Sequence, residues 1–489
     1  MFETAEIGKT LSKAEFDATL PEFRNELLKA QTRLETADFP VIVLINGADG
    51  AGKGDTLNRL YEWLDARYLT TFAYGPPSED ERERPEYWRY WMAMPRAGRI
   101  ALFFGNWYSR PILDRVHKRI DDGELALDLA EINSFERTLT DNGALLIKLW
   151  FHISKKEQRR RLERLESSKS TRWRVTPLDW KHHELYSQFC RVSDGVLRET
   201  SSGDAPWHVI ESTDDRYRDM TAARHILSEL QTRLEHTAHR SKPSPEPPIA
   251  DPHTILDTLD LSKTVDKKDY ETRIPLLQGR LNKLARKLGK KKRSAIFLFE
   301  GSDAAGKGGA IRRIAGALDA RQYTIIPIAA PTEEERAHHY LWRFWRHLPR
   351  RGRITIYDRS WYGRVLVERV EGFSAEPAWR RAYKEINDFE EDLTSDGIIL
   401  IKFWLHIGAE EQLERFQARE TEPWKQHKIG PEDYRNREKT PQYEAAVETM
   451  IEHCSTRHAP FTLVEANDKR HARVKVLETI CERLEAELR

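Results

Sequence analysis

The sequence predicts an α/β protein with two tandem domains, each built on a parallel β-sheet. Three observations carry this prediction. The two halves of the chain match each other at one constant offset, short apolar runs alternate with longer amphipathic stretches in both halves, and the first apolar run of each half leads into a glycine-rich loop. Strands that alternate with helices along a chain favour a parallel sheet covered by helices on both faces.

The repeat is long and has few gaps. Gly47 matches Gly301, which lies 254 residues later, and the same offset persists through both halves. It pairs residues 47–54 with 301–308, 95–100 with 349–354, 131–136 with 385–390, and 146–152 with 400–406. Solenoid repeats are only ~20–50 residues long, so a period of this length indicates a duplicated domain.

A proline-rich segment separates the two copies. Residues 241–252 contain five prolines. Because proline fixes φ and removes a backbone donor, this segment is predicted to be an extended, semi-rigid linker. The predicted domains are therefore residues 1–240 and 253–489.

Within each copy, the short apolar runs are predicted to be buried strands and the amphipathic stretches helices. The predicted strands are 41–45, 100–104, 144–151 and 207–210 in the first copy, and 295–299, 354–357, 398–405 and 461–464 in the second. The predicted helices include 12–36 and 125–140 in the first copy, and 266–288 and 378–394 in the second.

Composition excludes several classes of protein. The 489 residues include 80 lysines and arginines and 79 aspartates and glutamates, which gives a net charge of +1. A nucleic-acid partner is therefore not expected, and any polyanion site has to be a local basic cluster. Three cysteines without CxxC spacing favour neither a disulfide framework nor a Cys-rich zinc site. Since no signal-peptide pattern and no apolar run of ~18 residues is found, we expect a cytoplasmic protein without a membrane partner.

The glycine-rich loop of the second copy matches the Walker A pattern GxxxxGK. It covers residues 301–307, follows the predicted strand 295–299, and precedes a helix expected to begin near Gly306. In such a loop, backbone N–H groups and the helix N-terminus bind a phosphate, and the lysine, here Lys307, adds a positive charge. The predicted phosphate-binding residues of the loop are Gly301, Ala304, Ala305, Gly306 and Gly308.

Two aspartates are the predicted metal ligands of the second copy. The loop lysine is followed by Gly308, although Ser or Thr usually holds Mg²⁺ at that place. Metal binding is therefore assigned to carboxylates, namely Asp303 inside the loop and Asp358 at the end of the predicted strand 354–357. The alternative for Asp358 is a helix N-cap.

Several longer strings identify a family resemblance. They are Gly-Ser-Asp-Ala-Ala-Gly-Lys-Gly-Gly at 301–309, Asp-Arg-Ser-Trp-Tyr-Gly-Arg at 358–364, Phe389-Glu390, Lys-Phe-Trp-Leu-His at 402–406, and Glu411-Gln412. With them, the chain resembles the polyphosphate kinase 2 family, and its tandem form resembles the two-domain polyphosphate:AMP phosphotransferase subclass. The resemblance implies an α/β/α sandwich with a helical lid in each domain, Mg²⁺ as cofactor, polyphosphate as phosphoryl donor, and AMP as acceptor with ADP as product.

The resemblance also implies roles for individual residues. Lys307 contacts the transferred phosphoryl group, and Asp303 and Asp358 bind Mg²⁺. Arg359 and Arg364 bind phosphates, and Arg419 corresponds to an arginine of the lid. The predicted catalytic set is therefore Asp303, Lys307, Asp358 and Arg359.

Linear polyphosphate requires a track of basic side chains whose binding depends strongly on salt. The candidates lie just before and at the start of the strand that ends at Asp358, and they are Arg343, Arg346, Arg350, Arg351 and Arg353. The alternative is a solvated basic helix face. Trp342 and Trp345, three residues apart, are predicted to be core residues rather than a stacking platform for a base.

The first copy departs from these motifs. It keeps Asp49 and Lys53, but it reads Phe-Gly-Asn at 104–106 where the second copy reads Asp-Arg-Ser at 358–360. Leu165 stands at the position of Arg419. Losing a metal ligand together with an adjacent arginine predicts a catalytically inactive first domain. Such a domain would act as a pseudo-dimer partner and could still bind phosphate.

Three alternatives stay open at the level of the sequence. The acceptor could be ADP or GDP instead of AMP, and the donor could be ATP, as in nucleotide kinases on the same scaffold. The chain could also be a non-catalytic scaffold that binds polyphosphate or nucleotides. Association into a homo-oligomer is compatible with each of these functions.

Overall fold

The computed structural model describes residues 1–235, 255–424, 426 and 429–489. The predicted linker 241–252 lies outside the described residues. The chain forms two compact units: Met1–Pro77, Arg89–Lys242 and Glu333–His339 make up the first, and Ser78–Trp88, Pro243–Thr332 and Tyr340–Arg489 make up the second. No helix in the described part combines the length and apolar character that crossing a membrane requires.

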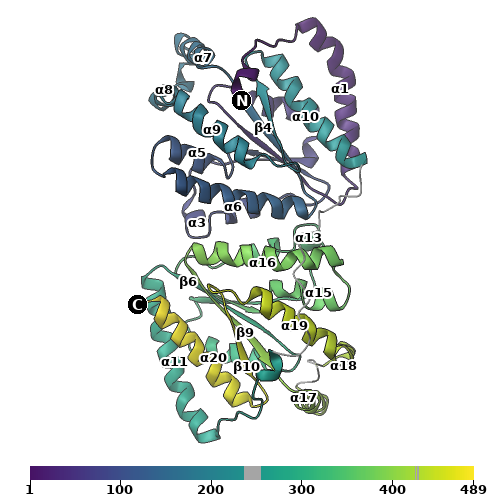
Figure 1. Cartoon of the computed structure of the whole chain (residues 1–489), viewed down its shortest axis with the longest axis vertical. Coiled ribbons are helices and arrows are strands. Elements are labelled where there is room, and N and C mark those ends of the chain that lie inside the picture. The colour runs from purple at the N-terminus through teal and green to yellow at the C-terminus, as the bar shows by residue number, and fades with distance from the viewer. Residues whose placement is uncertain (236–254, 425, 427–428) are drawn as a thin grey trace. The chain divides into compact units, whose positions relative to one another are not determined.

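A five-stranded parallel sheet forms the centre of the first unit (Figure 1). The strand order is β2-β3-β1-β4-β5, with β1 Val41–Gly47, β2 Leu69–Ala73, β3 Ile100–Phe104, β4 Leu145–His152 and β5 Trp207–Glu211. Strand β1 lies between β3 and β4, with Val41 opposite Ile100 and Leu145. These three strands are almost fully buried, which accounts for their continuous apolar sequences.

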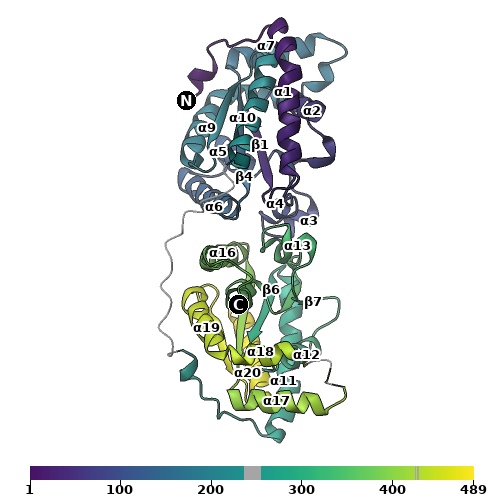
Figure 2. The same cartoon turned by 90° about the vertical axis from the view of Figure 1, so that its right-hand side faces the viewer.

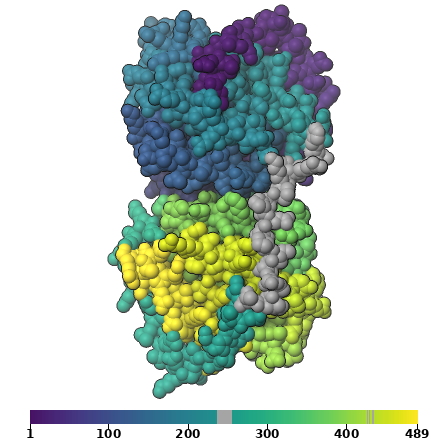
Figure 3. All heavy atoms as spheres, in the orientation of Figure 1, coloured from purple at the N-terminus to yellow at the C-terminus, as the bar shows by residue number. Residues whose placement is uncertain are grey.

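Helices cover both faces of this sheet (Figure 2). One face carries α1 (Lys13–Leu34), α2 (Lys53–Trp63) and α10 (Asp215–Glu235), and the other carries α5 (Ser109–Val116), α6 (Asp122–Asp141) and α9 (Tyr186–Thr200). Helix α1 lies beside α10, as the purple and teal surfaces of this unit show (Figure 3). Between β4 and α9, α7 (Lys155–Ser167) and α8 (Pro177–Glu184) form a lid at the carboxyl end of the sheet.

The second unit repeats this architecture. Its strand order is β10-β9-β6-β8-β7, with β6 Ser294–Gly301, β7 Tyr323–Pro327, β8 Ile354–Asp358, β9 Ile398–His406 and β10 Phe461–Glu465. One face carries α11 (Lys267–Lys290), α12 (Lys307–Ala315) and α20 (Lys469–Glu487), and the other carries α15 (Val367–Val370), α16 (Glu376–Ser395) and α19 (Thr440–Cys454). Helices α17 (Ala409–Thr421) and α18 (Pro431–Glu438) occupy the positions of α7 and α8.

Four further short helices complete the described elements apart from single 3₁₀ turns. They are α3 (Glu79–Arg82), α4 (Trp88–Trp91), α13 (Glu333–Arg336) and α14 (Trp342–Trp345). Trp342 and Trp345 are buried, as predicted for core residues.

The α/β prediction is confirmed, but each sheet has one strand more than the sequence suggested. The missed strands are β2 and β7, and each lies at the edge of its sheet. Their residues are mostly half-buried or exposed, and β2 contains two threonines. An edge strand contacts the core through few residues, so it lacks the continuous apolar sequence by which the other strands were found.

Candidate active site

The glycine-rich loop of the second unit connects β6 to α12. Gly301 ends β6 with φ of +152°, and a Cβ atom there would lie 2.4 Å from the carbonyl oxygen of Leu405. Gly306 is the N-cap of α12 and has φ of +105°. Glycine is therefore required at both positions, because any side chain would clash at the first and be strained at the second.

Lys307 folds back over this loop. Its Nζ donates hydrogen bonds to the carbonyl oxygens of Gly301, at 2.6 Å, and Ser302, at 3.3 Å. Burial lowers the pKa of the Lys307 ammonium, and the nearby Asp303 carboxylate opposes this shift. These two hydrogen bonds hold the lysine against the loop.

Asp303 connects the loop to two other elements. Its Oδ1 atom lies 3.2 Å from Nη2 of Arg359, and its Oδ2 accepts a hydrogen bond of 3.1 Å from Nδ2 of Asn436, on α18. Burial alone would raise the pKa of Asp303, but the charges of Lys307 and Arg359 outweigh it and lower the pKa. The carboxylate is therefore ionised at neutral pH.

Asp358 ends β8 directly beside β6, opposite Phe299. It is not a helix N-cap, since Ser360 fills that role for the following turn and accepts from the backbone N–H of Tyr362. The next residue, Arg359, has φ of +65°. A positive φ at an arginine is strained, and such strain is typical of functional sites.

Glu300 and Arg415 support the loop, and sequence reasoning missed both. The buried Glu300 carboxylate accepts a hydrogen bond of 2.7 Å from Ser360. Arg415 donates to the carbonyl oxygens of Ala304, at 2.8 Å, and Ala466, at 2.7 Å. The acidic residue next to Gly301 was a usable signal for Glu300, whereas nothing local indicates that Arg415 reaches the loop.

A cavity of about 700 Å³ opens over the loop. Its wall contains eight basic side chains and two carboxylates. The structure brings together these predicted residues in it: Asp303, Ala304, Ala305, Gly306, Lys307, Gly308, Asp358, Arg359 and Arg419. The remaining basic residues of the wall were not predicted from the sequence, and they are Arg312, Arg313, Arg415, Lys469 and Arg473.

Other predicted residues lie outside this cavity. Gly301 lies beneath the loop, and Arg364 contacts Ser374 at 3.0 Å and Glu368 at 3.1 Å. None of the five arginines predicted as a polyphosphate track lines the cavity. Arg343, for example, donates to the carbonyl oxygen of Ala329.

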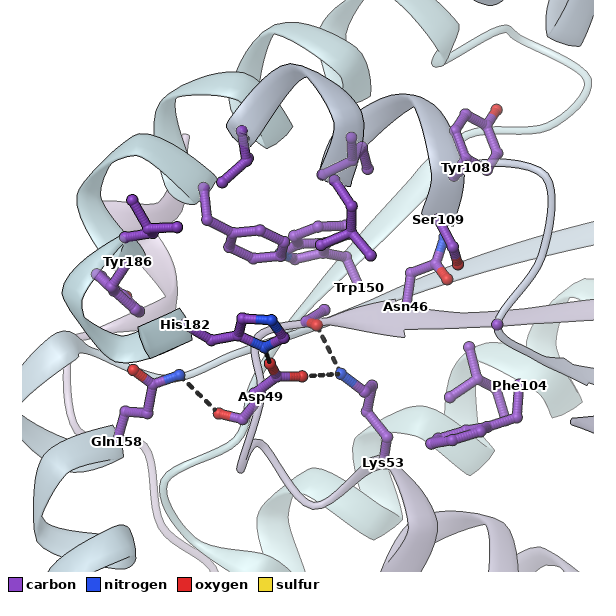
Figure 4. A pocket seen from close by; sticks show the side chains of 18 of the residues that line it. Asn46, Asp49, Lys53, Phe104, Tyr108, Ser109, Trp150, Gln158, His182 and Tyr186 are labelled. Carbon is purple, nitrogen blue, oxygen red and sulfur yellow. Dashed lines mark hydrogen bonds and ion pairs between the residues drawn. The ribbon is translucent and has the colours of Figure 1, made fainter. Parts of the chain in front are cut away.

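The first unit has the same loop with different surroundings (Figure 4). Lys53 donates to the carbonyl oxygens of Gly47, at 2.6 Å, and Ala48, at 3.0 Å. Asp49 lies between Lys53, at 3.8 Å, and Nδ1 of His182, at 2.8 Å. The cavity beside this loop measures about 240 Å³ and contains no arginine in its wall.

Together, the doubly covered parallel sheets and the basic cavity define the class of α/β phosphotransferases. The sequence model of the family Polyphosphate kinase 2 (PPK2) matches residues 10–238 and 264–489. The chain belongs to this family, and both units are members of it.

Full-length relatives have the same tandem organisation. The chain is 52% identical to a polyphosphate:AMP phosphotransferase of Pseudomonas aeruginosa, over 99% of each chain. It is 37% identical to one from Acinetobacter johnsonii, over 94% of this chain and 95% of the relative. A crystal structure assigned as a polyphosphate kinase 2 from Pseudomonas aeruginosa PA01 matches with a TM-score of 0.91 at 50% identity, covering 100% of this chain and 99% of that chain.

Proposed function

We infer that the chain transfers the terminal phosphoryl group of inorganic polyphosphate to AMP, which yields ADP and a shortened polyphosphate. Membership of the polyphosphate kinase 2 family and full-length relatives that bear the name polyphosphate:AMP phosphotransferase support this function. The reaction takes place in the cytoplasm in this proposal, where its nucleotides occur.

The second copy of the repeat, residues 253–489, is the proposed catalytic domain, and the first copy, residues 1–240, is the proposed degenerate one. The charge of the cavity walls carries this assignment. Of the eight basic residues around the second loop, five are replaced in the first copy, two of them by acids. At the same offset of 254 residues, Arg312, Arg359, Arg419, Lys469 and Arg473 correspond to Asn58, Gly105, Leu165, Asp215 and Asp219. A site for a polyanion needs basic side chains such as those of the second copy.

Lys307 and Arg359 are the proposed contacts of the transferred phosphoryl group, and Arg419 supplies a further charge from α17. Phosphoryl transfer requires in-line positioning of donor and acceptor and cations around the equatorial oxygens, with little covalent help from the protein. The loop N–H groups and Lys307 meet this requirement if the glycine-rich loop is a phosphate loop, as we propose.

Asp303 and Asp358 fit a magnesium ion. Both carboxylates line the same cavity, and Mg²⁺ is commonly held by one or two carboxylates together with substrate phosphates. When bound there, the ion would neutralise charge on the phosphate oxygens. We propose these two residues as the metal ligands.

For the polyphosphate chain, we propose a track along Arg312, Arg313, Lys469 and Arg473. All four line the cavity: Arg312 and Arg313 lie in the last turn of α12, and Lys469 and Arg473 lie in the first turns of α20. The side chain of Arg473 lies over the start of α12, since a Cβ atom on Gly309 would be 3.3 Å from its Nη2. These residues replace the five arginines that the sequence suggested.

The direct test is an assay of the purified full chain with Mg²⁺ and long-chain polyphosphate. AMP, ADP, GMP and GDP are supplied separately, and the products are separated by anion-exchange chromatography. We expect ADP from AMP, and no product with Asp358→Asn. If only ADP and GDP react, the acceptor is a nucleoside diphosphate and not AMP. Polyphosphate binding without any product would show a scaffold instead of an enzyme, and ATP replacing polyphosphate as donor would indicate a nucleotide kinase.

A further inference from the structure

The carboxylate of Asp303 is held from two sides, and one of the two partners lies on a lid helix. Nη2 of Arg359, directly after β8, lies 3.2 Å from Oδ1, and Nδ2 of Asn436, on α18, donates to Oδ2 at 3.1 Å. The main chain of Asp303 is fixed from α17, because Nε2 of Gln412 donates to its carbonyl oxygen at 3.1 Å. Both lid helices of the second unit therefore reach the same loop residue.

These contacts leave room for a cation on the same carboxylate. A carboxylate offers roughly four lone-pair positions, and Arg359 and Asn436 each take one oxygen. A lone pair therefore stays available on each oxygen. The Asp303 side chain is 21% exposed, and it lines the cavity together with Asp358. Asp303 can thus bind a metal ion and keep both of its protein contacts.

The amide of Asn436 suits this position because it carries no charge. An ionised carboxylate only accepts hydrogen bonds, so the amide faces Asp303 with its Nδ2 group. Such a donor fixes the orientation of the carboxylate, as hydrogen-bond partners of metal ligands commonly do. A second positive charge beside Arg359 would repel a bound cation instead. Asn436 therefore orients the carboxylate without weakening its attraction for a metal ion.

The first copy keeps this contact but changes the residue. At the offset of 254 residues, Asn436 corresponds to His182, whose Nδ1 lies 2.8 Å from Oδ2 of Asp49 (Figure 4). Gln158 again fixes the main chain, donating to the carbonyl oxygen of Asp49 at 3.0 Å. The hydrogen bond to Asp49 raises the pKa of His182, so this ring can bring a positive charge to the carboxylate. The permanently neutral donor thus occurs in the copy that contains both proposed metal ligands.

We propose that Asn436 is a positioning residue, which holds the Asp303 carboxylate in the orientation in which it binds Mg²⁺. The amide acts through Asp303 and does not itself touch the ion. Because Asn436 lies on α18, the carboxylate is held in this way while the lid helix lies against the loop. The position of the lid and the affinity for the metal ion are thereby linked. The inference rests on the proposed function, since it requires Asp303 to be a metal ligand.

Titration of the purified full chain with Mn²⁺, followed by electron paramagnetic resonance of the free ion, tests this role without turnover. Mn²⁺ takes the same oxygen ligands as Mg²⁺. Asn436→Ala should raise the Kd for Mn²⁺ by roughly tenfold. It should also lower kcat with polyphosphate and AMP at limiting Mg²⁺, and saturating Mg²⁺ should restore kcat. The matched control is His182→Ala, which removes the corresponding contact of the first copy and should change neither quantity.

A second variant separates the orientation of Asp303 from the anchoring of the lid. Arg437, the next residue of α18, donates to the carbonyl oxygen of Ala409 at the start of α17. Arg437→Ala removes this anchor without touching Asp303, so the Kd for Mn²⁺ should stay unchanged. The inference is overturned if Asn436→Ala leaves this Kd unchanged, if Arg437→Ala raises it equally, or if saturating Mg²⁺ does not restore kcat.

The variant Asp303→Asn distinguishes failure of this inference from failure of the metal assignment. If Asp303→Asn does not weaken Mn²⁺ binding, Asp303 is not a metal ligand, and both the assignment and the inference are wrong. If Asp303→Asn weakens binding and Asn436→Ala does not, the assignment stands and the inference alone is wrong.

Discussion

Arg359 combines a functional position with an unfavourable backbone conformation. It has φ of +65°, whereas the corresponding residue of the first unit is Gly105, with φ of +72°. An arginine in the left-handed region is strained by roughly 1–3 kcal/mol. The first unit has thus exchanged the strained side chain for the residue that relieves the strain.

Arg359→Gly should therefore separate stability from activity. We expect the free energy of unfolding to rise by about 1 kcal/mol, and turnover with polyphosphate and AMP to fall by roughly 10²–10³-fold. Denaturant unfolding and the nucleotide assay measure the two effects. As a control, Gly105→Ala should destabilise the first unit, because a Cβ atom would lie 2.6 Å from the carbonyl oxygen of Tyr74, and should leave turnover unchanged. Loss of stability in Arg359→Gly would contradict the strain.

Glu300 should make stability depend on pH. Burial raises the pKa of this carboxyl, although the hydrogen bond from Ser360 and the charge of Lys307 oppose the shift. Because its pKa is higher in the folded than in the unfolded state, the native protein loses stability as pH rises through the folded-state pKa. The first unit has the amide Asn46 at this position.

Glu300→Gln keeps the acceptor for Ser360 and removes the charge. We expect it to raise the free energy of unfolding at neutral pH, with the gain shrinking as the pH falls toward ~4. Urea unfolding at a series of pH values checks this. A gain that is equal at every pH would show that folding does not raise the pKa of Glu300.

At the scale of single residues, the sequence was informative where a motif is contiguous. The loop residues 303–308 and Asp358 lie at the cavity as predicted from strand–loop–helix spacing and from the end of an apolar strand. Lys469 and Arg473 could not be predicted in this way. They reach the cavity because β10 pairs with β9, which places α20 beside α12. No local sequence pattern predicts which strands pair.

At the scale of elements, both units hold β4 or β9 to the adjacent helices through one buried ionic cluster. Lys402 lies 2.6 Å from Glu390, which also accepts hydrogen bonds from Trp361 and Tyr362. In the first unit, Lys148 and Glu136 form the same pair at 2.8 Å. The same residue types recur at the repeat offset, but no local pattern shows that the lysine of an apolar strand pairs with a glutamate 12 residues earlier, in the preceding helix.

Breaking this cluster on one side should be severely destabilising. Lys402→Met leaves the fully buried Glu390 carboxylate without its counter-ion, and we expect a loss of about 3–5 kcal/mol in the free energy of unfolding. Lys148→Met should cost a similar amount in the first unit. The double variant Lys402→Met/Glu390→Leu should recover most of the loss. If it is as unstable as the single variant, the cluster contributes packing and not charge pairing.

At the scale of the whole molecule, the near-zero net charge conceals an uneven distribution. Basic side chains gather around one loop, and the other copy has lost most of them, although both copies keep the same sheet and helices. The duplicated fold was therefore predictable from the offset, whereas most of the basic residues that line the cavity of the second unit were not. Runs of arginine in a sequence, such as 350–353, do not reveal which helix ends face a shared cavity.

The salt dependence of polyphosphate binding distinguishes the two possible tracks. Arg473→Gln removes one cation of the cavity wall, so we expect the KM for polyphosphate to rise and the slope of log KM against log salt to fall by roughly 0.7–1. Arg346→Gln, from the track suggested by the sequence, should change neither quantity. If Arg346→Gln changes the KM and the salt slope and Arg473→Gln does not, polyphosphate binds along the helix that ends near Arg346 instead.

The central claim is that only the second loop is catalytic. The most direct measurement compares Lys307→Ala and Lys53→Ala in the polyphosphate and AMP assay, because the two lysines occupy matching positions and make matching loop hydrogen bonds. The account predicts a loss of at least roughly 10²-fold in kcat for Lys307→Ala, and an unchanged kcat for Lys53→Ala. Equal losses in both variants, or a greater loss in Lys53→Ala, would contradict it.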